Sequence, residues 1–115
     1  MKRTKSRGQR ASVRRPRSVL VLKLGGELLE SAADLERTAA GIAGLAQRSA
    51  VVIVHGGGRE IDAALATAGI PKQQVDGLPG TDSRTLDVVV SVLAGAINTR
   101  LVAAHRGAGA RPVGL

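Results

Sequence analysis

The 115-residue sequence contains no cysteine and no phenylalanine, tyrosine or tryptophan. Without cysteine, a disulfide framework, a thiolate zinc site and thiol catalysis are excluded. Without aromatic rings there is no platform on which to stack nucleobases, so specific nucleic-acid binding is disfavoured. No uninterrupted apolar run reaches the roughly 18 residues that span a bilayer, and the N-terminus lacks the apolar stretch of a secretory signal. We therefore expect one soluble, cytoplasmic domain with no membrane contact.

The excess of positive charge is confined to the N-terminus. Residues 1–17 hold eight lysines and arginines and no acidic residue, so they account for the whole net charge of +8. Such a polar segment buries too little apolar surface to offset its ordering entropy, which predicts a disordered basic tail over 1–17. Basic tails can bind nucleic acid, and that function stays open as an alternative, marked by strong salt dependence.

From residue 18 onward, short β-branched and leucine-rich runs alternate with helical patterns. The runs at 18–24 and 50–54 both end at glycines, which predicts two strands of a parallel sheet that are buried on both faces. Between them, a helix is predicted from Ser31 to Gln47, and a second helix ends at Gly69. Two strands joined by a helix form a βαβ unit, so the sequence predicts an α/β fold with a mostly parallel sheet.

The second part of the chain predicts a hairpin and a long helix. The Asp76-Gly77 pair between Val75 and Leu78 favours a tight turn, and Pro79 limits the second arm to an edge strand or to none. A helix is then predicted from Asp82 to about Ala104, and the glycine-rich end at 107–115 predicts a connection into a further strand. The apolar stripe of the long helix is expected at Leu86, Val89, Val90, Leu93, Ile97 and Leu101, widened by Val88 and Val92.

Two glycine turns follow the predicted strands, at Gly25-Gly26 and at His55-Gly56-Gly57-Gly58. The carboxyl ends of parallel strands are where α/β sheets bind ligands, and glycines let backbone N–H groups approach a phosphate. Lys23 is the only charge in its strand, and a buried ammonium needs an anion, so we expect it to face a phosphate. The alternatives are that Lys23 only extends into solvent at a strand end and that the glycines only form tight turns. We expect His55 to orient its loop rather than to act as a base.

With these motifs, residues from about Val19 to Leu115 resemble the amino-acid kinase family, and within it the acetylglutamate kinases of bacterial arginine biosynthesis. The resemblance implies a three-layer αβα sandwich, of which residues 18–115 form the acceptor-substrate half, while the nucleotide-binding half has no counterpart. It also implies transfer of the γ-phosphoryl group of ATP, with Mg, to the side-chain carboxylate of N-acetyl-L-glutamate. The motifs that carry it are Lys23-Leu24-Gly25-Gly26, Val54-His55-Gly56-Gly57-Gly58, Val75-Asp76-Gly77-Leu78, Thr81-Asp82, Thr85-Leu86-Asp87 and Ile97-Asn98-Thr99-Arg100-Leu101.

The resemblance also implies roles for individual residues. Lys23 is expected to stabilise the transition state between the β- and γ-phosphoryl oxygens. Gly25 and Gly26 are expected to donate backbone hydrogen bonds to the transferring group, and Gly57 and Gly58 to hold the acceptor substrate. No metal ligand is expected in this chain.

One position departs from the family pattern. Where the family has an arginine that binds the substrate α-carboxylate, this sequence has Pro79. That role is therefore expected to be lost. We expect Arg84, close by in the sequence, to be a surface charge.

Three functional readings remain open from the sequence. The first is an acetylglutamate kinase-like phosphotransferase that is inactive as this chain alone. A second is a non-catalytic interaction fragment of a kinase, which would form a homodimer or pair through the long helix from about Asp82 to Ala104. The third is the nucleic-acid binder that the basic tail leaves open, and an alternative acceptor within the first reading is a related one such as carrier-linked aminoadipate.

Overall fold

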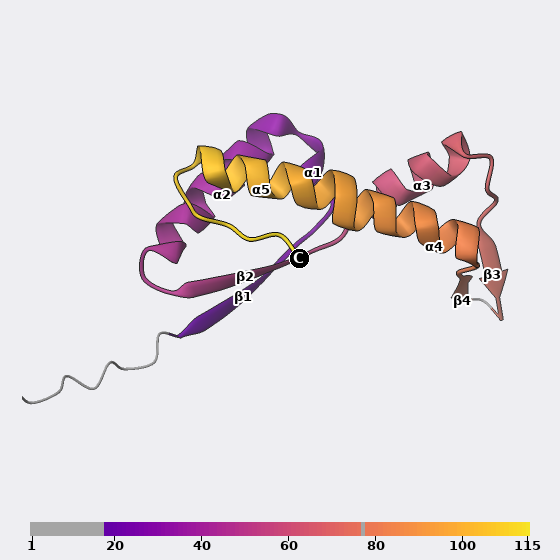
Figure 1. Ribbon diagram of the computed structural model, residues 1–115, viewed down its shortest axis with the longest axis horizontal. Helices are drawn as coiled ribbons and strands as arrows, with labels where there is room; N and C mark the ends of the chain where they lie inside the picture. The colour runs from indigo at the N-terminus through magenta and orange to yellow at the C-terminus, as the bar shows by residue number, and fades with distance from the viewer. Residues whose placement is uncertain (1–17, 77) are drawn as a thin grey trace, which may run out of the picture.

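The computed structural model describes residues 18–76 and 78–115, so the predicted basic tail lies outside it. Figure 1 shows the arrangement of the elements. In chain order they are β1 (Val19–Leu24), α1 (Glu27–Glu30), α2 (Ala32–Ala46), β2 (Ala50–His55), α3 (Gly58–Thr67), β3 (Gln73–Val75), β4 (Leu78–Gly80), α4 (Ser83–Val90), the π-helical turn η1 (Ser91–Ile97) and α5 (Asn98–Gly107).

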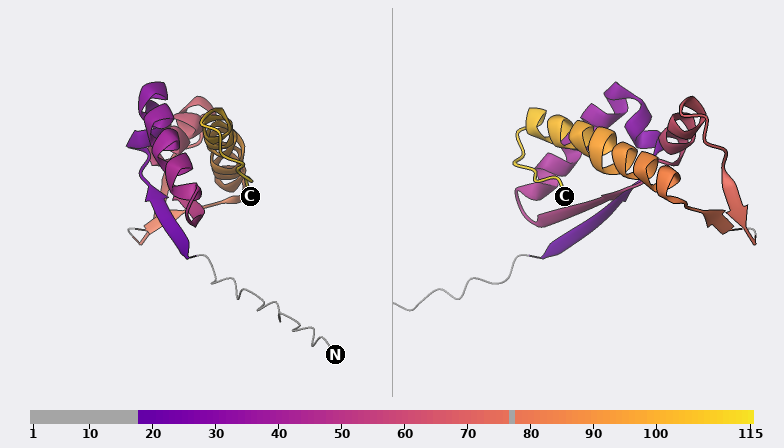
Figure 2. Two further views of the ribbon diagram at one scale, coloured as in Figure 1. Left: turned by 90° about the vertical axis from the view of Figure 1, so that its left-hand side faces the viewer. Right: turned by 45° about the vertical axis from the view of Figure 1, so that its right-hand side comes forward.

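The strands β1 and β2 form the parallel pair that the sequence predicts. They run in register from Val19 opposite Ala50 to Leu24 opposite His55. The connecting helix α2 and the distant helix α5 pack against each other on the same side of this sheet (Figures 1 and 2). The α/β class with a parallel sheet is therefore confirmed. The described residues supply one β layer and one helical layer of the sandwich.

One face of the sheet is uncovered, and the expected burial of the strands on both faces is wrong. Side chains alternate along each strand, and the inward set, including Leu22, Leu24 and Ile53, packs into the core under the helices. No helix in the described ranges covers the opposite face. There the exposed fractions are 64% for Val19, 62% for Val21, 48% for Val52 and 49% for Val54.

The helix α2 begins where the sequence predicts. The Ser31 side chain accepts a hydrogen bond from the Asp34 backbone N–H at 3.3 Å, which satisfies one of the free N–H groups of the first turn. Leu35, Ala39 and Ile42 are buried on the face that the 3.6-residue period predicts. The short helix α1 was not predicted, and its Leu29 joins the same core.

The long helix is continuous from Ser83 to Gly107 but contains the π-helical turn η1, which the sequence did not predict. In this turn the Asn98 N–H donates to the carbonyl of Leu93, five residues back. The extra residue rotates the preceding part of the helix relative to the part that follows. The expected stripe is therefore wrong at Leu86 and Val90, which are about half exposed, whereas Val92, expected to widen the stripe, is buried with Ile97 and Leu101.

The hairpin is confirmed. β3 and β4 pair antiparallel with Val75 opposite Leu78, and Asp76 has φ of +52°, the left-handed conformation that a two-residue turn requires. Pro79 lies in β4 opposite Gln74, in a sheet of two strands, so it occupies an edge strand as predicted. At the C-terminus, residues 110–115 form no strand, because they make no ladder with β2.

By length and composition, the helix Ser83–Gly107 could cross a membrane. The sequence has no uninterrupted apolar run of that length because Ser91 and the stretch 98–100 are polar. This evidence for a membrane span is weak, since the core helix of a soluble protein passes the same test. Ile97 and Leu101 of this helix are buried against the rest of the chain.

The uncovered sheet face should drive self-association of the isolated chain, because contiguous exposed valines favour pairing or aggregation. We expect Val52→Lys to lower the average mass seen by sedimentation velocity at a given concentration. The control is Leu45→Lys, which adds the same charge at an exposed apolar side chain of α2, in the helical layer. Equal behaviour of the two variants would contradict the assignment of self-association to this face.

The start of α4 should show a pH-dependent contribution to stability. The Asp82 carboxylate accepts a hydrogen bond from the Thr85 backbone N–H at 2.8 Å, and this bond holds the pKa of Asp82 below its ordinary value of 3.8. The stabilisation is then fully present above pH 3.8 and is lost as the pH falls through the lower folded-state pKa. We expect Asp82→Ala to lower the urea midpoint at pH 7, and the difference from wild type to shrink at the acid end. A difference that is independent of pH would contradict this.

Candidate functional site

The parallel pairing of β1 and β2 brings the two glycine turns side by side. Leu24 lies opposite His55 at the end of the ladder, and the Gly56 N–H donates to the Leu24 carbonyl at 3.2 Å. A Cβ placed on Gly26 would lie 4.0 Å from both the Cα and the N of Gly57. The two turns, about 30 residues apart in the sequence, therefore form one surface at the carboxyl edge of the sheet.

Gly57 and Gly58 have different surroundings within the second turn. Gly57 is buried, and a Cβ there would lie 2.3 Å from Ile97 Cδ1 and 2.9 Å from Leu93 Cδ2. Gly58 is exposed at the first position of α3, and a Cβ there would meet nothing within 4 Å. Only at Gly57, therefore, does the surrounding structure leave no room for a side chain.

The helix α3 begins at this turn, so its N-terminus lies there. Its N-cap is Gly57, which offers no side-chain acceptor to the first-turn N–H groups. These N–H groups have no intrahelical partner, and the helix dipole adds partial positive charge at the same point. The turn and the helix start together present several backbone donors to an anion.

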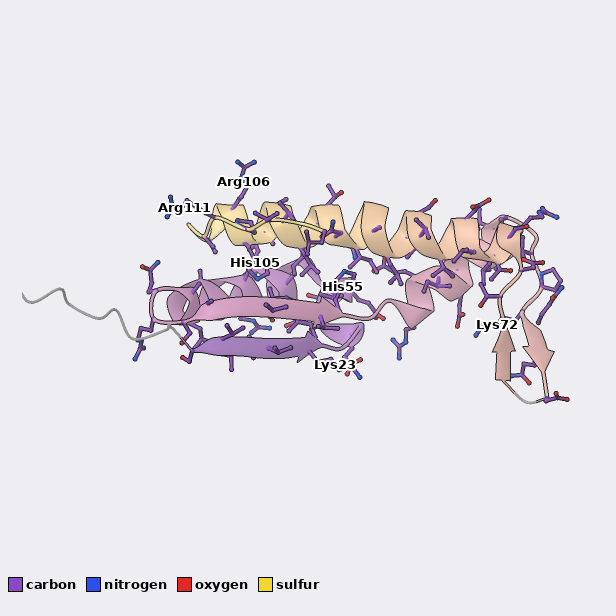
Figure 3. The ribbon with its side chains drawn as sticks, turned by 60° about the horizontal axis from the view of Figure 1, so that its bottom comes forward. Lys23, His55, Lys72, His105, Arg106 and Arg111 are labelled. Atoms are coloured by element: carbon purple, nitrogen blue, oxygen red, sulfur yellow. The ribbon has the colours of Figure 1, made fainter. Side chains whose placement is uncertain are left out.

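Lys23 lies near the carboxyl end of β1, opposite Val54, on the uncovered face of the sheet (Figure 3). It is exposed, so the prediction that burial forces it to meet an anion is wrong: no layer covers this face in the described residues. Within 18–76 and 78–115, no carboxylate pairs with it. The Lys23 ammonium is therefore available to a ligand at the edge where Gly25 and Gly26 follow.

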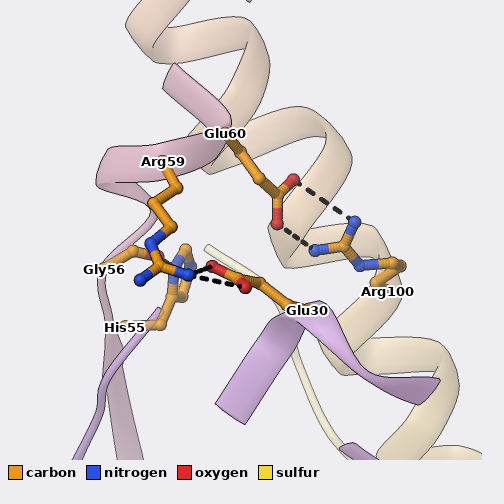
Figure 4. A network of polar contacts seen from close by, with 6 residues as sticks. All are labelled: Glu30, His55, Gly56, Arg59, Glu60 and Arg100. Atoms are coloured by element: carbon orange, nitrogen blue, oxygen red, sulfur yellow. Dashed lines mark hydrogen bonds and ion pairs between the residues drawn. The ribbon is translucent and has the colours of Figure 1, made fainter. Parts of the chain in front are cut away.

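Two ion pairs around the turns were not predicted from the sequence (Figure 4). Arg59 donates to the carboxylate of Glu30 at 3.1 and 3.4 Å, which joins the start of α3 to α1. Arg100 donates to both oxygens of Glu60, at 2.6 and 3.3 Å, which joins α3 to α5. The partners lie 29 and 40 residues apart in the sequence, so no local sequence pattern predicts these ion pairs.

Two further polar groups act on the turns locally. The His55 ring, through Nδ1, hydrogen-bonds the Gly56 carbonyl at 3.1 Å, which supports its expected role in orienting the loop. Glu27 was not predicted, and its carboxylate lies 3.1 to 3.2 Å from the place of a Cβ on Gly25. A negative charge so close to the first turn opposes the binding of an anion there.

Other expected and unexpected features lie away from the turns. The hairpin that contains Pro79 lies at the opposite end of the long helix from β1 and β2 (Figures 1 and 2), so this chain does not bring Pro79 to the glycines. A cavity of about 440 Å³ lies between β2, α5 and residues 111–115. The buried His105 lines it, donating from Nδ1 to the Leu101 carbonyl at 2.7 Å. In the part of the chain that the structure describes, no three His, Cys, Asp or Glu residues are grouped to hold a metal ion.

The sequence of this chain matches known kinases. Residues 18–115 match the model of the amino acid kinase family. The acetylglutamate kinase of Sorangium cellulosum is 45% identical over 97 residues, which cover 84% of this chain and 34% of that protein. The acetylglutamate kinase of Solibacter usitatus is 44% identical over 99 residues, covering 84% and 38% respectively. The chain thus spans about a third of the length of these curated relatives.

Solved structures share the fold. The N-acetylglutamate synthase of Neisseria gonorrhoeae, solved with coenzyme A and N-acetyl-glutamate, superposes with a TM-score of 0.66 at 31% identity, over 83% of this chain and 22% of that one. A Streptococcus mutans protein superposes with a TM-score of 0.65 at 24% identity, over 83% of this chain and 38% of that one, which bears on the fold alone. On the match over residues 18–115, the chain belongs to the amino acid kinase family.

Proposed function

We propose that this chain is the acceptor-side part of an acetylglutamate kinase of arginine biosynthesis, which transfers the γ-phosphoryl group of ATP to the side-chain carboxylate of N-acetyl-L-glutamate. The observation that carries the proposal is the contact between the two glycine turns, with Lys23 at the same sheet edge. The similarity to curated acetylglutamate kinases supports the choice of acceptor.

In this proposal the chain contributes positioning and fixed positive charge rather than covalent chemistry. Lys23 stabilises the charge that develops between the β- and γ-phosphoryl oxygens. The N–H groups of Gly25 and Gly26 donate to the transferring phosphoryl group, and those of Gly57 and Gly58 hold the acceptor side. Because the turns are joined through backbone, the donors are fixed before the ligand arrives, which is what makes such groups effective.

In this proposal ATP is a substrate, and this chain contacts its phosphates rather than its base. When bound, Mg²⁺ neutralises charge on the β- and γ-phosphoryl oxygens. It commonly binds through substrate phosphates and one or two carboxylates, and the described residues contain no cluster of three candidate ligands.

In this proposal, part of the nucleotide site lies outside this chain. It spans about a third of its relatives, so the adenine and ribose contacts belong to the remainder of the family domain, and this chain alone does not turn over ATP. We place the protein in the cytoplasm, where a biosynthetic kinase finds its substrates. We further propose that two copies pair through the long helix, whose Leu86 and Val90 are exposed.

A chimera tests the function directly. Residues 18–115 replace the matching third of the Sorangium cellulosum enzyme, and acyl phosphate is trapped with hydroxylamine. We expect phosphorylation of N-acetyl-L-glutamate that falls at least about 100-fold in Lys23→Ala, the loss typical of removing one transition-state donor. The matched control is Lys72→Ala, which removes an exposed lysine whose Nζ pairs with Asp62 at 2.8 Å. A folded chimera with no activity, or with equal activity in both variants, would contradict the proposal.

Glu27 should weaken the binding of anions at the first turn. We expect Glu27→Gln to bind inorganic pyrophosphate a few-fold more tightly, at most about fivefold, because a screened surface charge contributes up to about 1 kcal/mol. Chemical shifts of the Gly25 and Gly26 amides report the titration. Glu36→Gln, on the exposed side of α2, is the control and should leave the affinity unchanged. An unchanged affinity in Glu27→Gln would show that the carboxylate does not face the bound anion.

In this chain the hairpin lies away from the glycine turns, and we propose that the completed domain of the chimera brings it to the acceptor, where Pro79 should limit acceptor affinity. A guanidinium that meets a carboxylate forms charge-assisted bonds of about 1.5–3 kcal/mol each, and proline offers neither charge nor N–H. We expect Pro79→Arg to bind N-acetyl-L-glutamate at least about tenfold more tightly by calorimetry, since 1.4 kcal/mol corresponds to tenfold. Equal affinities would show that the carboxylate is held elsewhere, with Arg84 the first residue to test.

A further inference from the structure

We infer that the π-helical turn η1 is the element that positions the second glycine turn, with Leu93 and Ile97 as positioning residues and Gly57 as their point of contact. Its consequence for ligand binding rests on the proposed function, in which this turn holds the acceptor side of one anion site formed by both glycine turns. The inference assigns the need for glycine at position 57 to the packing of a helix against the turn.

The contact between the helix and Gly57 leaves no room for a side chain. A Cβ at position 57 would lie 2.3 Å from Ile97 Cδ1, far inside van der Waals contact, and 2.9 Å from Leu93 Cδ2. The end of a flexible side chain can often move away from such a clash. Ile97 cannot do so freely, because it is fully buried at 0% exposure and packed in the core. The backbone of Gly57 has φ of 172°, outside the left-handed region that favours glycine, and the packing gives a direct reason for glycine there.

Leu93 and Ile97 are four residues apart, a spacing that shares one face in any α-helix, and the π-helical turn adds Val92 to the buried face beside them. In a regular α-helix, residues five apart point about 140° away from each other, at about 100° per residue. Val92 and Ile97 are five apart, yet both are buried in the same core cluster. The bond from the Asn98 N–H to the Leu93 carbonyl gives the π-type spacing that makes this possible. Leu93 lies between the two in sequence and reaches Gly57 together with Ile97.

A second contact fixes the helix that starts at this turn. Glu60 lies in the first turn of α3, and Arg100 lies in the first turn of α5, directly after η1. Arg100 donates to both carboxylate oxygens of Glu60, at 2.6 and 3.3 Å (Figure 4). The start of α3 is thus held to the long helix on both sides of the Gly58 N–H, by apolar packing at Gly57 and by the ion pair at Glu60. Any displacement of η1 should move the Gly58 donor.

A double-mutant cycle tests the contact in the full chain. Gly57→Ala should lower the urea midpoint of unfolding, and Gly58→Ala, the same change at an open position, should not. Ile97→Val removes the Cδ1 atom itself and should lower the midpoint of the wild type. In the Gly57→Ala background the same change should raise the midpoint. The recovery should be only partial, because Leu93 Cδ2 remains close to the new Cβ. Additive effects of the two substitutions would overturn the contact.

Phosphate binding tests positioning beyond stability. Inorganic phosphate is titrated while the Gly58 amide resonance is followed in folded samples. We expect Gly57→Ala to weaken the affinity about tenfold, and Gly57→Ala/Ile97→Val to recover most of it, because displaced donors lose a large part of their effect. Gly44→Ala, in an open exposed position of α2, is the control for affinity.

Different results would overturn the positioning role of η1 and the proposed function. An unchanged phosphate affinity and an unchanged Gly58 amide shift in Gly57→Ala would overturn the positioning role. No response of the wild type to phosphate would overturn the proposed function instead. In that case the unfolding cycle and the Gly58 amide shift in the absence of phosphate would still decide whether η1 positions the turn.

Discussion

The structure depends on the register of a single pair of parallel strands. Because Leu24 lies opposite His55, β1 and β2 end at the same level of the sheet, and each strand is followed there by a glycine turn. A shift of one residue would separate the turns and would exchange the buried and exposed faces of a strand. The pairing therefore decides where Gly26 meets Gly57 and which side of the sheet the helices cover.

The long helix is the second determinant, and it connects the sheet edge to the rest of the chain. It packs against α2 on one part of its length and against α3 on another. On a straight α-helix, an apolar stripe with a regular spacing gradually changes direction along the helix, so it does not face both α2 and α3. The π-helical turn changes the direction of the side chains at the level of Gly57. Meanwhile the uncovered valines of β1 and β2 show that the described residues complete only one side of the sheet.

Sequence reasoning succeeded where a few neighbouring residues decide the structure. The Ser31 cap, the Asp76 turn and the glycine endings of both strands are local signals, and the structure confirms them. It failed where the outcome depends on distant parts of the chain. The π-helical turn packs against Gly57, more than 30 residues away in the sequence, so the exposure of Val90 could not be predicted from the local pattern. The exposure of Val19 and of Lys23 depends on which layers are present, and the ion pairs join residues 29 and 40 apart.

The central claim is that the two glycine turns act as one anion site. The most direct measurement is a titration of the full chain with inorganic pyrophosphate, followed by the ¹⁵N-glycine amide resonances of both turns. The account predicts that Gly25 and Gly26 shift together with Gly57 and Gly58 along curves that fit one dissociation constant. Shifts confined to one turn, or two different constants for the two turns, would contradict it.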